Sequence, residues 1–182
     1  LLDCQVLAIS GGWSPTVHLH SQSGAKARFD EVLACFVPGN SVQAECSAGS
    51  SAGVFDLAGC LGGGVKAGVA AAAASGWAGA TPDAPMAKGG QSGAIQACWE
   101  VPSPELGPTG TKKFLDFQND TTVADVQLAV REGYWSIEHV KRYTALGFGT
   151  DQGKLGNING MAIAARCLKR SIPEVGTTVF RP

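Results

Sequence analysis

The clearest pattern of apolar positions lies in the C-terminal half of the chain, where it follows a helical repeat. Apolar residues spaced three and four apart fall on one face of a helix and can form one buried stripe. This spacing predicts a helix after Thr122 that ends at Gly133, a second helix over Ser136–Leu146 and a third over Asn157–Lys169. The stripes are Val123, Val126 and Val130, then Ile137 and Val140, and finally Ile158, Met161, Ala162 and Ala165.

Helix-boundary signals support this division. Thr122 is followed three residues later by Asp125, which resembles a capping box with Asp in place of the usual Glu or Gln. Gly133 suits a helix end because glycine adopts positive φ without steric cost. A strand over 113–118 leads into these helices, so the sequence predicts a compact module over residues 113–170.

Shorter apolar runs in the rest of the chain predict strands and one further helix. The run 4–10 is closed by Gly11 and Gly12, as in a buried strand of an α/β sheet. The small-residue stretch 54–74 is predicted to be mainly helical, and the polar stretch 17–23 to be irregular. Further strands are expected over 32–37, 42–48 and 94–101.

A stretch of small and polar residues separates the two halves. Residues 76–93 are rich in glycine, alanine and proline, which is typical of a linker. We therefore expect four parts: an α/β part over 1–78, a linker with a short strand over 79–112, the helical module over 113–170, and an exit segment over 171–182.

Composition narrows the class of protein. The chain has 182 residues, a net charge of −1 and 45% hydrophobic residues. A near-neutral chain gives no electrostatic argument for nucleic acid or an anionic membrane. The run 65–74 contains Lys66 and is too short to span a bilayer, so we expect a soluble, cytoplasmic protein. Because the chain starts without Met, we expect it to be a piece of a longer polypeptide.

The spacing of the six cysteines does not match a metal-binding motif such as CxxC. No two of them lie within ten residues of one another, so buried, inert thiols are the favoured interpretation. His18 and His20 would share a face of an extended segment and could bind a metal, but no third ligand is placed near them. A structural role for both histidines is therefore the preferred interpretation.

A cationic corner follows the second predicted helix. Lys141 and Arg142 fall in its last turn, where the helix dipole favours cations, and Gly147 and Gly149 break the chain just beyond. Hydroxyl, amide and ammonium groups follow, and together they suit a phosphate or another oxyanion. These groups belong to Thr144, Thr150, Gln152 and Lys154. The alternative is an ordinary helix end with two solvated basic residues.

A second candidate is the glycine–serine turn 49–53, which lies between a predicted strand and the small-residue helix. Such a turn lets a backbone approach a dinucleotide pyrophosphate at a helix N-terminus. The turn departs from the GxGxxG pattern, and no acidic residue stands where that fingerprint requires one. The alternative is a glycine-rich helix start packed on a sheet.

The run from Phe114 to Pro182 resembles the alpha subunit of heterotetrameric sarcosine oxidase, and so do the upstream segments LAISGGWSPTVHLHSQSG and FVPG. The resemblance implies an α/β fold in which residues 1–78 complete a dinucleotide-binding, disulfide-reductase-like sheet. It implies NAD as the dinucleotide, with the main glycine fingerprint upstream of residue 1. Partial contacts are then expected from Gly11, Gly12, Ala48, Gly49 and Gly53. The chain alone is expected to bind NAD poorly.

The module 113–170 also resembles the two-iron ferredoxin domain carried by relatives of this subunit. Aligning KRYT and the glycines beyond it places Asp116 and Gln118 at the first cysteine pair, and Asp151 and Gly156 at the second. A cluster needs four soft ligands, so the resemblance implies a helical module without an iron–sulfur cluster or another metal.

The resemblance implies a flavin-dependent oxidoreductase that converts sarcosine to glycine, with peroxide formed and the one-carbon unit passed to tetrahydrofolate. FMN would lie at the interface with the beta subunit, and the cationic corner 141–154 is the candidate for its phosphate. Further implied partners are the smaller subunits and, through a missing downstream domain, tetrahydrofolate. No catalytic residue is expected in this chain. Two alternatives are a related amine or opine dehydrogenase subunit and a non-catalytic docking module.

Overall fold

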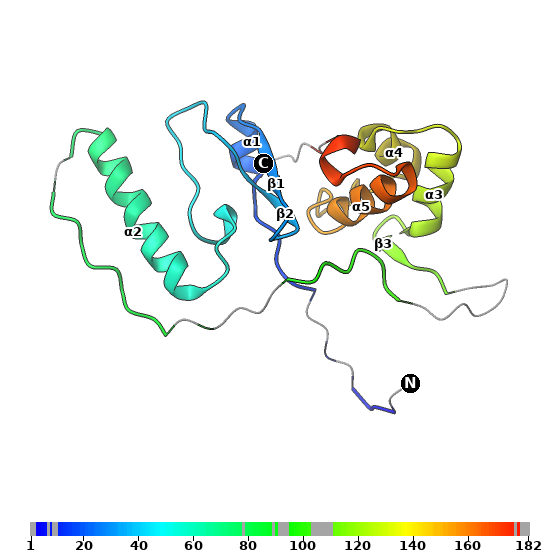
Figure 1. The fold of residues 1–182 in the computed structure, drawn as a ribbon, viewed down its shortest axis with the longest axis horizontal. Coiled ribbons are helices and arrows are strands. Elements are labelled where there is room, and N and C mark those ends of the chain that lie inside the picture. The colour runs from blue at the N-terminus through cyan, green and yellow to red at the C-terminus, as the bar shows by residue number, and fades with distance from the viewer. Residues whose placement is uncertain are drawn as a thin grey trace.

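The computed structural model describes residues 3–6, 8, 11–77, 79–88, 90, 95–102, 111–176 and 178. Within these residues, a small N-terminal unit stands between a long separate helix and a C-terminal helical module (Figure 1). Residues 79–88 and 95–102, which lie between the long helix and the module in sequence, form no helix or strand. The fold is therefore a mixture of helices and small sheets.

The N-terminal unit consists of α1 (His18–Gln22) and a hairpin of β1 (Ala27–Asp30) and β2 (Cys35–Pro38). The strands are antiparallel, from the pair Ala27 and Pro38 to the pair Asp30 and Cys35. The Asp30 carboxylate accepts hydrogen bonds from the N–H groups of Val32 and Leu33, which fixes the turn between them. The 3₁₀ helix η1 (Gly49–Ala52) follows and contacts β2.

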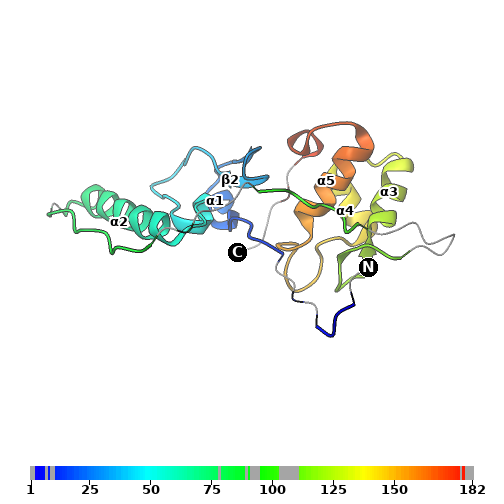
Figure 2. The same ribbon diagram turned by 60° about the horizontal axis from the view of Figure 1, so that its bottom comes forward.

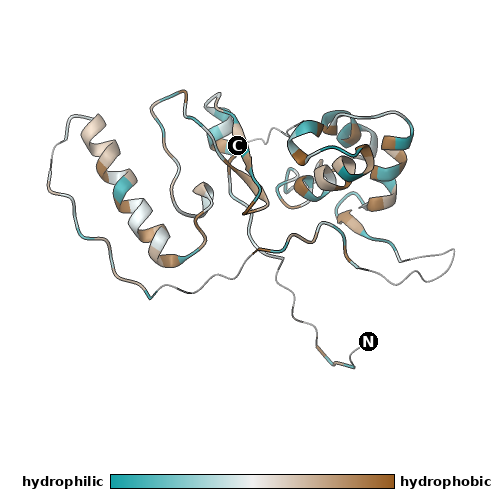
Figure 3. Ribbon diagram, viewed as in Figure 1, coloured by the Kyte–Doolittle hydropathy of each residue, from teal (hydrophilic) through white to brown (hydrophobic). Residues whose placement is uncertain are grey.

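The long helix α2 (Leu57–Ala74) begins at Asp56, whose carboxylate accepts a hydrogen bond from the N–H of Gly59. None of its residues is buried, and two views show it apart from the helical module (Figures 1 and 2). In Figure 3 the ribbon of α2 is mostly white to brown, the colours of intermediate and hydrophobic residues. Of the helices in the described ranges, α2 alone is long and apolar enough to cross a membrane, by length and composition only.

This finding changes the argument against a membrane-spanning segment, which rests in the sequence on the run 65–74 alone. The helix has 18 residues rather than ten, so the argument from shortness no longer holds. Length and composition are weak evidence for a span because the core helix of a soluble protein passes the same test. The absence of a membrane stays a prediction.

The C-terminal module combines a short hairpin with three helices. The elements are β3 (Phe114–Asp116), β4 (Thr121–Thr122), α3 (Val123–Arg131), α4 (Ile137–Thr144), α5 (Asn157–Leu168) and the 3₁₀ helix η3 (Ile172–Val175). Its core contains Val126, Ile137 and Val140 from the predicted stripes, all fully buried, and also the fully buried Ile163, which lies outside them. The predicted Val130 and Ile158 are only partly buried. Helix α3 begins with the predicted capping box, in which Thr122 and Asp125 bond each other's backbone N–H groups.

Close contact between α5 and the segment after α4 depends on a glycine. A Cβ atom at Gly160 would overlap the side chain of Leu146, which is fully buried. The absence of a side chain at Gly160 therefore lets Leu146 fill the space beside α5.

Several strand predictions are wrong for the described residues. Residues 4–6 and 8 form no strand, and residues 42–48 and 95–101 are extended or bent without a partner. A strand needs a neighbour for its backbone groups, and no parallel sheet occurs in the described part of the chain. The stretch 17–23 contains α1, although it was predicted to be irregular. The rest of runs 4–10 and 94–101 lies outside the described residues.

Candidate functional site

The cavity between the two units

A cavity of about 540 Å³ lies where the N-terminal unit meets the helical module. One wall comes from residues 14–36 and the other from residues 153–178, so segments more than a hundred residues apart in sequence form it together. Its apolar lining includes Pro15, Val17, Phe36, Ile158, Met161 and Pro173. A volume of this size lies in the range of small-molecule sites, which are mostly apolar with a few polar groups.

The polar lining of the cavity is cationic. Lys26 comes from the N-terminal unit and Lys154 from the loop before α5, and both are exposed residues. His18 lies on the same wall as Lys26, and its pKa is lowered by burial first and by the nearby Lys154 charge second. The imidazole of His18 is therefore neutral at pH 7, and the positive charge of the site comes from the lysines.

Where the predicted site residues lie

The structure separates the predicted cationic corner. Lys141 is buried and lies 3.7 Å from the Glu138 carboxylate, while Arg142 is exposed and lies 3.4 Å from the same carboxylate. Arg142 also donates a hydrogen bond to the backbone carbonyl of Glu138. Both cations are thus paired within their own helix, and only Lys154 of the predicted group lines the cavity.

The hydroxyl and amide groups of this corner also have partners within the protein. Thr144 donates its hydroxyl to the carbonyl of Val140, and Gln152 donates its amide to the carbonyl of Gly149. Thr150 donates both its N–H and its hydroxyl to the Gln118 side chain. These bonds shape the loop itself.

Two of the four positions aligned with cluster cysteines, Asp116 and Gln118, form a hydrogen-bonded clamp on the loop 147–156, which contains the other two. Asp116 accepts the N–H of Gly147 at 2.8 Å, and Gln118 accepts the N–H of Thr150 at 2.5 Å. A Cβ at Gly156 would lie only 2.5 Å from the carbonyl oxygen of Leu115, and Asp151 accepts the N–H of Leu155. Side chains at the strand end thus hold the loop that follows α4. Among the described residues, no group of three or more His, Cys, Asp and Glu could hold a metal.

The pKa of Asp116 is governed by two opposing effects. Burial of the carboxyl raises the pKa, but the hydrogen bonds from Gly147, Asn119 and Gln118 favour the charged form and outweigh burial. The pKa of Asp116 consequently lies below its ordinary value. The carboxylate is charged at neutral pH and holds the backbone of two segments, at 118–119 and at Gly147.

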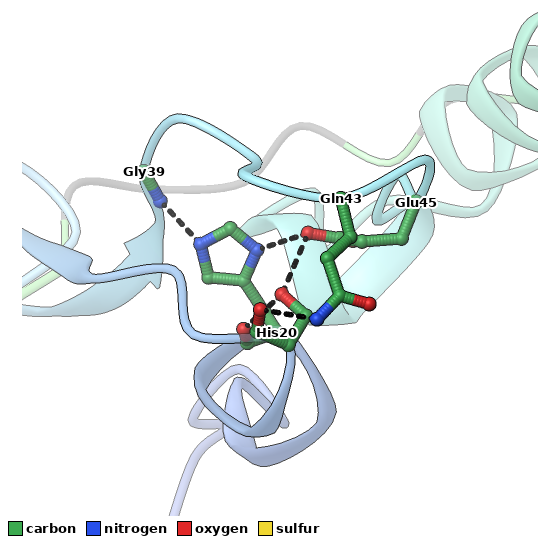
Figure 4. A network of polar contacts seen from close by, with 5 residues as sticks. His20, Gly39, Gln43 and Glu45 are labelled. Carbon is green, nitrogen blue, oxygen red and sulfur yellow. Dashed lines mark hydrogen bonds and ion pairs between the residues drawn. The ribbon is translucent and has the colours of Figure 1, made fainter.

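His20 is buried in a hydrogen-bonded network (Figure 4). Its Nε2 accepts the N–H of Gly39 at 3.1 Å, and its Nδ1 lies 2.9 Å from a carboxylate oxygen of Glu45. Both ring nitrogens are therefore used within the protein. The preferred structural interpretation of His20 agrees with this geometry, and His18 lies apart from it at the cavity wall.

The glycines predicted to contact NAD differ in how closely the protein surrounds them. Gly11 and Gly12 are exposed with nothing within 4 Å of an added Cβ, whereas an added Cβ at Gly53 would lie 2.9 Å from Val37. Ala48 and Gly49 flank the start of η1. At α2 the Asp56 carboxylate already takes the capping position at which a phosphate would be expected.

Similarity to known proteins

The C-terminal module is similar to a known domain family. Residues 110–182 match the family model of the sarcosine oxidase A3 domain. That range contains β3, the three module helices and the hydrogen-bonded clamp.

Nearly the whole chain is homologous to a segment of the sarcosine oxidase alpha subunit. It is 38% identical over 182 residues, 98% of this chain, to sarcosine oxidase subunit alpha of Corynebacterium sp. (strain P-1). It is 37% identical over 179 residues to the subunit of the same name from Rhizobium meliloti (strain 1021). The chain spans 19% and 17% of these relatives, about a fifth of their length. The predicted resemblance is confirmed.

The fold also resembles that in the crystal structure of L-proline dehydrogenase from P. horikoshii. The TM-score is 0.64 at 19% sequence identity, covering 92% of this chain and 35% of that chain. The shared fold includes the separate N-terminal and C-terminal parts, because the match extends over almost all of the chain.

Sequence reasoning missed the cavity and two of its residues. No pattern in the sequence marks Lys26, and the spacing of His18 and His20 indicates at most a metal ligand. The cavity joins residues 14–36 to residues 153–178, and no short motif marks a contact at that separation. The unusual density of polar residues between Trp13 and Lys26 was the available signal.

Proposed function

We propose that this chain is part of the alpha subunit of a flavin-dependent sarcosine oxidase, in a cytoplasmic complex with a beta subunit and smaller subunits. The observation that carries the proposal is 38% identity over 98% of the chain to such alpha subunits. The reaction would be the oxidative demethylation of sarcosine to glycine, with peroxide release and one-carbon transfer to tetrahydrofolate. The part of this chain in it would be cofactor positioning and subunit docking.

The proposal is tested by producing the subunit with its genomic partner subunits. Sarcosine-dependent peroxide release by the purified complex is the expected result, together with bound flavin. A complex that assembles, carries flavin and oxidises another amine instead would favour the related dehydrogenase or oxidase. Assembly without any flavin would favour a docking module, for which the supporting observation is the apolar helix α2, none of whose residues is buried.

FMN is the proposed cofactor at the subunit interface, with its phosphate near the loop after α4. We expect Arg142→Ala to weaken FMN retention by the assembled complex by about 1–3 kcal/mol, the loss typical of one charge-assisted hydrogen bond. Flavin content after extensive dialysis measures this. Arg131→Ala is the control, because Arg131 is also an exposed arginine in the last turn of a helix.

Unchanged flavin content in Arg142→Ala would leave Arg142 with its observed role alone, pairing with Glu138. In that case Lys154 would be the remaining candidate among the predicted cations, since it has no ion pair with the described residues and lines a cavity. NAD is proposed only as a ligand to which this chain adds partial contacts. An iron–sulfur cluster is not proposed.

A further inference from the structure

The loop 147–156 forms part of the wall of the cavity between the two units. Gly153 and Lys154 line the cavity from this loop, next to Met161 of α5. Met161 lies four residues after Asn157, so both side chains are on the same face of α5. Although Met161 lines the cavity, its exposed fraction is only 2%. A movement of the loop away from this face would therefore give small molecules access to it.

Asn157 is buried against the loop with its side-chain amide unpaired. Its exposed fraction is 1%, and neither the oxygen nor the nitrogen of the amide has a hydrogen-bond partner among the described residues. An added Cβ would lie 2.2 Å from this amide at Gly147 and 2.1 Å from it at Gly153, so the loop closes directly over it. A buried amide without partners costs free energy that exposure to water would recover.

The backbone of this segment carries a second cost. Ala145 and Gln152 have φ values of 58° and 53°, in the left-handed region that non-glycine residues rarely occupy. Such conformations persist only where surrounding contacts enforce them, and they are typical of switch segments and ligand clamps. One such contact comes from Gln118, just after β3, which accepts both the N–H and the hydroxyl of Thr150.

The loop also leaves its large apolar side chains outside the core. Phe148 and Leu155 are both exposed, and so are the hydrogen bonds between Gln118 and Thr150. Apolar burial is the main favourable contribution to folding, so a segment held mostly by polar contacts opens at a lower free energy than the core. A few hydrogen bonds thus hold the loop closed against two unfavourable features.

We propose that the loop 147–156 is a gate on the cavity, which opens locally while α5 and the rest of the module stay folded. In the open state the amide of Asn157 reaches water and Met161 becomes accessible. The hydrogen bonds from Gln118 hold the closed state. Local opening depends on neither the oxidase reaction nor a partner subunit.

The two methionines of the chain provide a matched pair of probes. Met86 is fully exposed, whereas Met161 is enclosed. Dilute hydrogen peroxide oxidises an accessible thioether to the sulfoxide, and the peroxide is reduced to water. Mass spectrometry of peptides from the purified chain measures the oxidation rate of each methionine. The ratio of the Met161 rate to the Met86 rate reports how often Met161 is accessible.

The dependence of this ratio on urea separates local opening from global unfolding. A local opening exposes little surface, so we expect the ratio to stay constant at low urea concentrations. Oxidation through global unfolding would instead rise steeply with urea, in step with the unfolded fraction. We also expect the ratio without urea to exceed the unfolded fraction extrapolated from urea titration by about tenfold or more.

Variants assign the opening to the loop. Gln118→Ala removes both hydrogen bonds to Thr150 and is expected to raise the ratio about five- to tenfold. Asn157→Leu keeps the approximate shape of the side chain without its unpaired polar atoms, and is expected to lower the ratio several-fold. Gln127→Ala is the control, because Gln127 is an exposed glutamine on α3, and the Met86 rate should be the same in all variants.

Two results would overturn the proposal. The first is a Met161 rate that follows global unfolding at every urea concentration. The second is an equal ratio in wild type and Gln118→Ala, which would mean that Met161 becomes accessible through another movement, such as separation of the two units. Gln118 is exposed, so this variant decides the question even where Asn157→Leu fails to fold. A subunit complex that does not oxidise sarcosine would leave these rates unchanged.

Discussion

Single residues in this protein hold long-range contacts through polar side chains. Asp116 in β3 reaches Gly147 beyond α4, and His20 in α1 reaches Gly39 and Glu45 beyond the hairpin. Each side chain is buried and has its polar atoms satisfied. Removing one of these side chains would leave buried N–H groups without an acceptor. The resulting loss of folding free energy is larger than the net contribution of an ordinary hydrogen bond.

Asp116→Asn is expected to lower the free energy of unfolding by about 1–3 kcal/mol at pH 7, because an amide cannot accept on both atoms. The depressed pKa of Asp116 makes its contribution pH-dependent. Its stabilisation is present above the ordinary pKa of an aspartate, near 4, and is lost as the pH falls through the lower folded-state value. The difference between wild type and variant should therefore shrink below pH 4 in urea titrations.

Asp120→Asn is the matched control for that measurement. Asp120 is exposed and has a φ of 53°, a conformation that Asn tolerates as well as Asp. We expect a change below about 0.5 kcal/mol at both pH values. An equal loss in both variants would contradict the role assigned to Asp116.

His20→Ala is expected to lower the free energy of unfolding by about 2–3 kcal/mol. The substitution removes both ring hydrogen bonds, leaves the N–H of Gly39 without its acceptor and opens a cavity. His139→Ala is the comparison, because His139 lies exposed on α4 and should change stability by less than about 0.5 kcal/mol. Thermal or chemical unfolding monitored by circular dichroism measures both.

At the scale of elements, the three helices of the module were predictable from the sequence, whereas α1 and most of the strands were not. The stripes at 123–130, 137–140 and 158–165 gave helices within two residues of their observed ends, because helix stability depends on local periodicity and caps. The run 42–48 has an apolar pattern suited to a strand but no partner. Strand formation depends on a neighbour that a local pattern does not specify.

The close approach of α5 to Leu146 predicts that glycine-to-alanine substitutions in α5 and in α2 change the free energy of unfolding in opposite directions. Gly160→Ala is expected to destabilise the module by about 1–3 kcal/mol through overpacking, although alanine favours a helix more than glycine. Gly62→Ala in α2, where nothing lies within 4 Å, is expected to stabilise by about 0.5–1 kcal/mol. Changes of the same sign in both variants, measured by urea unfolding, would contradict the packing argument.

At the scale of the molecule, the boundary between linker and module lies earlier than the sequence composition indicates. Glu100 pairs with Lys113 at 2.6 Å and with Arg166 on α5, and Trp99 packs against the module core. Trp99 and Glu100 lie in the predicted linker range 79–112. The prolines and small residues of that range do not indicate that it packs against the module. Contacts between distant segments, including the whole cavity, were beyond local reasoning for the same reason.

Glu100→Gln is expected to release this attachment and to speed chymotryptic cleavage after Trp99 several-fold. The amide keeps the shape of the side chain but loses the charge that holds Lys113 and Arg166. Glu31→Gln in the exposed turn between β1 and β2 serves as the control. Mass spectrometry of timed digests measures the rate, and equal rates in wild type and Glu100→Gln would show that Trp99 alone holds the segment.

The clamp formed by Asp116, Gln118 and the loop 147–156 is made from carboxylate, amide and backbone groups. Hydrogen peroxide damages proteins chiefly at sulfur, where a thiolate is oxidised in steps. A loop fastened without sulfur keeps its shape in an oxidising environment. If the surrounding enzyme does release peroxide, the side chains of the clamp, Asp116 and Gln118, offer it no sulfur to oxidise.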